Sequence, residues 1–429
     1  MGRQVRPRNH PAAVQSAPLP ETLDRVTQTP GESPASSAFA GRGVQLALAL
    51  LIVVALASFA YVLHGQGQPR LALSVVFGMV FGITVQRARF CFYCMYRDWF
   101  DNRDSSGLFG LIVALAVATI GTTLVFGAWL PDASTGRLPP DAFIGPVSIA
   151  LALAGLSFGA GMAISGSCVS AHLYRLGEGS PTAPFALAGT VGGFALGFLS
   201  WNMLYSAIIV DAPVVWLPRS LGYAGALLLS LALLGLLAWG LNRSGRLRAE
   251  ALTVPADGFT ALFITRWPAW IGGAIIGALA VMSYLRVAPI GVTAEIASRT
   301  RQVAGSVGIT PERLEGLDTL RGCVGVVRDV LLSNNGAFVL ALVFAAFAAA
   351  LAAGQFKPVR PTRGHVLRGL IGGVLLGWGA MTGLGCTVGT LFSGISAGAL
   401  SGWVFGAALF AGTSATLIAG RRLGLLAAK

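Results

Sequence analysis

The apolar residues of this chain gather in long runs that are separated by short polar segments. Seven runs are long enough to cross a bilayer as a helix, which takes about 20 residues; they cover 44–63, 108–130, 185–210, 221–241, 267–285, 336–353 and 399–419. Three shorter or glycine-rich runs have the same character and cover 71–85, 147–164 and 370–381. The pattern predicts ten crossings of a membrane.

Helices are the predicted form of these runs. Backbone groups in lipid must be hydrogen-bonded within the segment, and the runs are too long and too apolar for the alternating strands of a membrane barrel. The composition agrees, because 55% of the residues are hydrophobic and only 11% are charged. We therefore expect an all-α polytopic membrane protein, and the composition excludes a soluble one.

Basic residues beside the spans predict the orientation, since lysine and arginine near span ends stay on the cytoplasmic side. They place both termini in the cytoplasm. The same bias accounts for much of the net charge of +13, which therefore does not by itself indicate an anionic substrate. We expect no nucleic-acid partner. The predicted organisation begins with a disordered basic cytoplasmic tail (1–43) and a first transmembrane half (44–241). A cytoplasmic connector (242–260) leads to a second transmembrane half (261–429), which contains a periplasmic connector (286–333).

The two halves share a pattern, G-x3-G-x-G-x6-C-x4-L-[YF]. Placing Cys168 over Cys386, an offset of 218 residues, superimposes three glycines before the cysteine and a Leu-aromatic pair after it. The orientation puts the two copies upside down relative to each other. We therefore expect two inverted repeats whose re-entrant, glycine-rich broken helices meet at the midplane, where transporters form their sites. The glycines could also be close helix-packing seams.

The polar segment "GSCVSAHLYRLGEGS", at 166–180, interrupts two apolar runs and is expected to line a passage inside the protein. Three of the five cysteines, Cys91, Cys168 and Cys386, follow such interruptions. A buried cysteine is often only a small hydrophobic residue. A row of thiols, however, suits a soft, sulfur-bearing solute better than a hard ion, and half-helix ends favour an anion.

Cys91 and Cys94 form a C-x2-C pair among three arginines. Such a pair could be a redox dithiol or half of a metal site, because nearby positive charge favours the reactive thiolate. A structural zinc site needs four ligands, and the sequence has no second C-x2-C pair and no histidine pair at the right spacing. We expect neither a metal nor a cofactor.

Several motifs carry a resemblance to a known family. The segments "QRARFCF" with "YRDWF", "SGSCVSAHLYRLGEGS", "APIGVTAEI" and "TGLGCTVGTLFSGISAGALSGW" resemble those of the YeeE/YedE family of sulfur transport permeases. The similarity extends from about Leu71 to the end of the chain. Characterised members of that family take up thiosulfate, which implies a permease for thiosulfate or a related reduced-sulfur anion in the inner membrane of a bacterial cell.

The resemblance also implies roles for individual residues. Three central cysteines, one in each re-entrant loop, pass the anion along by contacts between thiol and sulfur; the matching positions are Cys91, Cys168 and Cys386. Supporting residues that do not touch the solute are Arg89, Tyr174, Arg175 and Glu178. Arg175 and Glu178, three residues apart, could equally be an ion pair that holds the loop. Neither Cys94 nor Cys323 has a matching role.

Two hypotheses therefore remain at this point. The first is a permease, not an enzyme, whose partners are the lipid bilayer, a small sulfur anion and possibly a separate cytoplasmic sulfur-carrier protein. The second is a membrane thiol-disulfide or sulfane-sulfur oxidoreductase with Cys91 and Cys94 as the working pair. Loss of Cys94 would separate them, because only the second mechanism requires that thiol.

Overall fold

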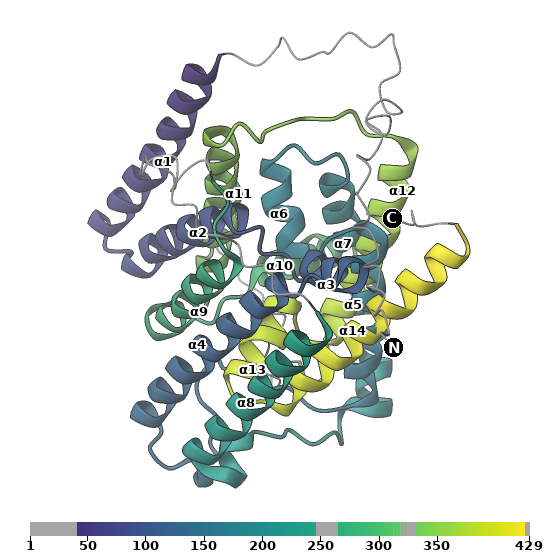
Figure 1. Ribbon diagram of the computed structural model, residues 1–429. Helices are drawn as coiled ribbons and strands as arrows, with labels where there is room; N and C mark the ends of the chain where they lie inside the picture. The colour runs from purple at the N-terminus through teal and green to yellow at the C-terminus, as the bar shows by residue number, and fades with distance from the viewer. Residues whose placement is uncertain are drawn as a thin grey trace, which may run out of the picture. The chain divides into compact units, whose positions relative to one another are not determined.

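The structure is a computed structural model of the whole chain, and it describes residues 41–245, 265–311, 313–317, 320, 322 and 332–424 (Figure 1). The predicted tail up to residue 40, most of the predicted cytoplasmic connector and Cys323 lie outside these residues. Within them the chain is helical, with no strand longer than an isolated bridge. The predicted all-α class is confirmed.

The α-helices are numbered along the chain. In chain order they are α1 (Arg42–Gly65), α2 (Pro69–Arg87), α3 (Phe92–Asn102), α4 (Ser106–Trp129), α5 (Ile149–Ser165), α6 (Val169–Gly177), α7 (Ala183–Leu204), α8 (Leu217–Ser244), α9 (Ala269–Arg286), α10 (Val292–Ser306), α11 (Asn334–Ala352), α12 (Arg363–Thr382), α13 (Gly394–Ser396) and α14 (Leu400–Arg422). Single turns of other helix types are η2 (Ala133–Thr135), η3 (Tyr205–Ile209) and η5 (Thr387–Ser393), of which the last two are π-helical.

The membrane-spanning capacity matches the hydrophobic pattern. Over the described ranges, nine helical segments are long and apolar enough to cross a bilayer, and α12 with the bent segment after it makes a tenth. Each of the ten predicted segments coincides with one of these helices, with ends that differ by seven residues at most. Helix α1 shows why burial alone does not identify a span: Leu50 and Leu51 are 65% and 63% exposed, as lipid-facing residues should be.

Glycines form the closest helix contacts in the core. Helix α5 packs along α12 and α14, and α12 packs along α7 (Figure 1). A Cβ atom on Gly159 would lie 2.8 Å from the Thr413 nitrogen of α14, and one on Gly377 would lie 2.8 Å from the Phe194 nitrogen of α7. Real Cβ atoms do not approach so closely, so these positions require glycine. The repeated glycines therefore serve helix packing.

The contact between α5 and α12 pairs equivalent positions of the two sequence repeats. A Cβ on Gly161 would lie 2.6 Å from the Gly372 oxygen, and one on Gly379 would lie 2.7 Å from the Ala154 oxygen. The offset of 218 converts the first pair into the second. Since later residues of α5 meet earlier residues of α12, the two helices run antiparallel.

The predicted connector over 286–333 contains a helix that the apolar pattern did not reveal. Helix α10 packs against α7, α11 and α6. It carries an ion pair one turn apart, with Arg299 Nε 2.7 Å from Glu295 Oε1. Its apolar residues are too few for a span, which is why the hydrophobic runs assigned this stretch to a connector. Helix α10 is thus part of the packed helical structure.

Candidate functional site

Each of the three predicted cysteines occupies the N-cap of a short helix that follows a break. Cys91 precedes α3, Cys168 precedes α6, and Cys386 precedes the π-helical segment η5. The first turn of a helix presents backbone N–H groups without intrahelical partners. The chain therefore combines a thiol with the positive end of a helix three times.

The backbone turns in the same way before each cysteine. The residue two positions earlier has a positive φ in all three loops: 48° at Arg89, 82° at Gly166 and 57° at Leu384. Only the second of these is a glycine, although this left-handed region costs other residues roughly 1–2 kcal/mol. Strained backbone of this kind is typical of functional loops. It also gives Arg89 a role in the turn itself, which its charge alone did not indicate.

The thiols are deeply buried and form no disulfide among the described residues. Cys91, Cys168 and Cys386 each have 0% exposure, and all are free cysteines within one hydrophobic core. The Cys91 thiol lies close enough to interact with those of both Cys168 and Cys94. The Cys94 backbone nitrogen donates to Cys91 Sγ at 3.4 Å, and Cys168 Sγ lies 3.2 Å from Ser170 Oγ. The first two cysteine loops thus meet at their sulfur atoms, while Cys386 lies on its own loop.

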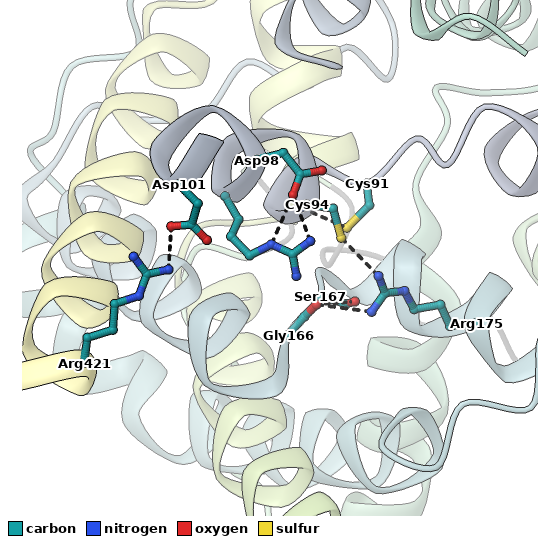
Figure 2. Close-up of polar contacts among 9 residues, drawn as sticks. Cys91, Cys94, Asp98, Asp101, Gly166, Ser167, Arg175 and Arg421 are labelled. Atoms are coloured by element: carbon teal, nitrogen blue, oxygen red, sulfur yellow. Dashed lines mark hydrogen bonds and ion pairs between the residues drawn. The ribbon is translucent and has the colours of Figure 1, made fainter. Parts of the chain in front are cut away.

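Arg175 connects these two loops (Figure 2). Its Nη2 donates to Cys94 Sγ at 3.1 Å, and its Nη1 donates to the Gly166 carbonyl oxygen at 3.3 Å. One guanidinium therefore holds α3 and the break between α5 and α6 in register. Sequence reasoning named Arg175 but gave Cys94 a role only in the oxidoreductase alternative; the structure makes Cys94 a hydrogen-bond partner of Arg175 and of Cys91.

The possible ion pair between Arg175 and Glu178 does not form in the described chain. Glu178 Oε1 instead accepts from Gln86 Nε2 at 3.4 Å, and the same Gln86 nitrogen donates to Gln355 Oε1 at 2.8 Å. Glu178 therefore links the end of α6 to the end of α2. It lies beyond α6, and burial raises the pKa of its carboxyl, an effect that the nearby Arg175 opposes.

Two further side chains of α6 are buried beside the second cysteine. Tyr174 is 2% exposed, and His172 is 1% exposed with its Nε2 3.0 Å from Ser165 Oγ. Among the described residues, no three His, Cys, Asp or Glu side chains gather as a metal site would require. His172 is thus held by a hydroxyl of α5, and the chemistry of the site is that of thiols, hydroxyls and one guanidinium.

Hydroxyl groups surround the third cysteine loop, which sequence reasoning did not single out. A cavity of about 20 Å³, room for about one water molecule, is lined by residues that include Ser148, Thr382, Thr390 and Ser401. The Thr382 hydroxyl is buried with no hydrogen-bond partner in the described structure. The threonines of "TGLGCTVGT" carry this signal in the sequence, but only the fold brings Ser148 and Ser401 to them.

Comparison with known proteins decides the family. The protein family described as "Sulphur transport" matches residues 87–415, which include all three cysteine loops and the helices that hold them. The chain belongs to this sulphur transport family. It is accordingly a multi-pass membrane protein of a transport family, with the helical spans described above.

Individual members of the family show how far the similarity extends. The chain is 27% identical to a protein named thiosulfate transporter TsuA from Spirochaeta thermophila over 345 residues, or 76% of this chain and 92% of the relative. It is 25% identical to thiosulfate transporter TsuA from Escherichia coli over 73% of this chain and 84% of the relative. A probable transporter, YedE of Escherichia coli, is 30% identical over 40% of each chain.

Proposed function

We propose that this protein imports thiosulfate or a closely related reduced-sulfur anion across the bacterial inner membrane. The observation that carries the proposal is the repeated arrangement of a buried free cysteine at a helix N-cap, two residues after a residue of positive φ. Two relatives that align over most of the chain are named thiosulfate transporters. The alignment with this chain covers more than four-fifths of each relative.

The arrangement suits a sulfur anion physically. The positive helix end and its free N–H groups stabilise negative charge, as at other anion sites. The thiol is a weak donor with a polarizable sulfur, so it favours the terminal sulfur of thiosulfate over a harder oxygen anion. Arg175 adds a positive charge next to the first two loops. Several weak sites in succession allow the anion to leave as readily as it enters.

In the proposed path the anion moves between Cys91, Cys168 and Cys386 without forming a covalent bond. Each thiol donates an S–H hydrogen bond to the anion, and the anion then moves to the next thiol. The proximity of the Cys91 and Cys168 thiols supports their role as adjacent stations. Cys386 is the third, and its loop neighbours Thr382, Leu384 and Thr390 line the hydroxyl-rich cavity.

We further propose that the two halves are inverted repeats whose broken helices re-enter the membrane and meet near its midplane. Gly161 contacts Gly372, and the equivalent Gly379 contacts Ala154, which is the position equivalent to Gly372; this pairing supports a two-fold relation. The antiparallel course of α5 and α12 supports the inversion. The basic segments beside the spans then place both termini in the cytoplasm.

Arg89, Tyr174, Arg175 and Glu178 act in this proposal as positioning residues. Arg175 fixes two loops through Cys94 and Gly166, and Glu178 fixes the end of α6 through Gln86. Arg89 forms the turn before the first thiol. We expect a separate cytoplasmic protein to accept the sulfur. The alternative of a thiol oxidoreductase is not favoured, because the relatives are named as transporters.

Growth on thiosulfate tests the proposal. A bacterial host that lacks sulfate uptake is supplied with thiosulfate as its sulfur source and expresses the full chain or a variant. We expect growth with the wild type and with Cys94→Ser, which keeps an acceptor for Arg175, and no growth with Cys91→Ala, Cys168→Ala or Cys386→Ala. Absence of growth with membrane-inserted wild type would refute thiosulfate import. Loss of growth with the single variants Cys94→Ser and Cys91→Ala, but not with Cys168→Ala or Cys386→Ala, would support the dithiol mechanism.

A further inference from the structure

A groove on the side of the helix bundle contains one charged residue, and neither the cysteine path nor the family assignment explains it. The Arg87 groove lies between α1, α2 and α11, has a volume of about 180 Å³, and is lined by residues that include Ala49, Ile83, Arg87, Ala348, Ala349 and Ala352. The small alanine side chains leave the space open between the three helices. Leu50, another lining residue, is 65% exposed, so the groove reaches the lipid-facing surface of α1.

Arg87 is buried without adequate partners. The residue is 1% exposed, and its Nη2 donates to the Thr265 carbonyl oxygen. Its Nε and Nη1 are buried and have no hydrogen-bond partner in the described part of the chain. Buried donors in proteins are almost always satisfied, and an unpaired buried charge is costly. The structure therefore leaves Arg87 with unmet donors beside an apolar groove.

The surroundings of Arg87 add positive charge. The charged side chains that act on its guanidinium are those of Arg266 and Arg89, which repel it. Glu178 interacts with Arg89 and Arg266 and with Arg175. Its carboxylate accepts from Gln86 and does not reach Arg87. Among the described residues, no acidic side chain forms a hydrogen bond or ion pair with Arg87 at this end of the groove.

We propose that the Arg87 groove binds an anionic phospholipid. The guanidinium of Arg87, whose Nε and Nη1 are enclosed by the surrounding helices, turns toward the groove and donates to the phosphate. An acyl chain lies against Ala49 of α1, Ile83 of α2 and Ala349 of α11. Guanidinium groups bind phosphate through paired, charge-assisted hydrogen bonds, and basic pockets between transmembrane helices bind lipid head groups. The apolar walls are unsuited to a small hydrophilic anion such as the transported solute. The bound lipid would join α1 to the helices that position the first cysteine loop.

Lipid titration of the purified, delipidated full-length protein in detergent tests this site. Phosphatidylglycerol is the anionic probe, phosphatidylcholine is the zwitterionic control, and glycerol 3-phosphate is the soluble head-group control. The readout is the shift in Tm as a function of lipid concentration, because a ligand of the folded state raises Tm. We expect phosphatidylglycerol alone to raise Tm. Arg87→Gln should need roughly tenfold more of it for the same shift, as loss of a charged hydrogen bond implies.

Matched variants separate the site from general charge effects. Arg70→Gln removes a cation from the exposed other end of α2 and should respond as the wild type does. Ala349→Leu keeps Arg87 but fills the groove, so it should also lose the response, and it carries the test if Arg87→Gln does not fold. An equal response of Arg87→Gln and wild type, an equal shift with phosphatidylcholine, a shift with glycerol 3-phosphate alone, or no shift at all would overturn the proposal.

Discussion

Ser157 and Leu375 are joined by a hydrogen bond in which the serine hydroxyl donates to the leucine carbonyl oxygen at 3.1 Å, and they are separated by 218 residues. The same separation aligns Cys168 with Cys386. Equivalent positions of the two sequence repeats therefore touch each other where α5 crosses α12. A contact between equivalent positions is what a local two-fold axis produces. The two cysteine loops extend from the ends of these two helices.

Removing the guanidinium of Arg175 should slow transport more than it destabilises the fold. Arg175→Met keeps much of the side-chain volume but loses the hydrogen bonds to Cys94 Sγ and to the Gly166 oxygen. Loss of a charged hydrogen bond costs about 1.5–3 kcal/mol, so we expect roughly tenfold or greater loss of thiosulfate uptake. Radiolabelled thiosulfate uptake into cells measures this. Arg360→Met, on an exposed loop, is the control. Equal uptake by both variants would contradict a role of Arg175 in holding the two cysteine loops together.

Gly377→Ala should destabilise the protein by overpacking. The new Cβ would lie 2.8 Å from the Phe194 nitrogen and closer still to the Thr190 carbonyl oxygen, so α12 and α7 would have to separate. Overpacking of this kind costs about 1–3 kcal/mol. Thermal unfolding in detergent should show a lower Tm. Gly127→Ala, at a helical glycine of α4 with open space around it, should leave Tm unchanged or slightly raised.

The number and order of spans could be predicted because lipid imposes one requirement on every crossing segment: a long run without charges. Helix α10 could not, since its residues Glu295 and Arg299 satisfy each other locally and its burial depends on α7 and α11. The sequence likewise showed that Cys168 and Cys386 are equivalent. It could not show that Cys94 accepts a hydrogen bond from Arg175, because the two residues are 81 positions apart and meet only through the fold.

The role of the glycines shows a similar limit. Their spacing before Cys168 and Cys386 fits either a passage lining or a packing seam, because both need small residues. Which one applies depends on the neighbouring helix, and Gly159 and Gly377 each face a backbone atom of that neighbour. The positive φ values at Arg89 and Leu384 had no sequence signal, since such positions usually carry glycine.

Gly166→Ala should isolate the cost of the turn before Cys168. Gly166 has a φ of 82° and no atom within 4 Å of a Cβ placed on it, so a methyl group would strain the backbone without a clash. We expect a loss of stability of roughly 1–2 kcal/mol. A lower Tm with reduced uptake would show that the turn positions the thiol. An unchanged Tm would mean that the loop can adopt another conformation at no cost.

The most direct test of the account is the flux of radiolabelled thiosulfate into proteoliposomes that contain only this protein. The wild type and Cys94→Ser should take up thiosulfate at similar rates, since Cys94 positions Arg175 and serine keeps an acceptor there. Cys91→Ala, Cys168→Ala and Cys386→Ala should each lose most of the flux while remaining folded by Tm. Full flux through any of these three variants would contradict a path along the N-cap thiols, and no flux through the wild type would contradict thiosulfate transport itself.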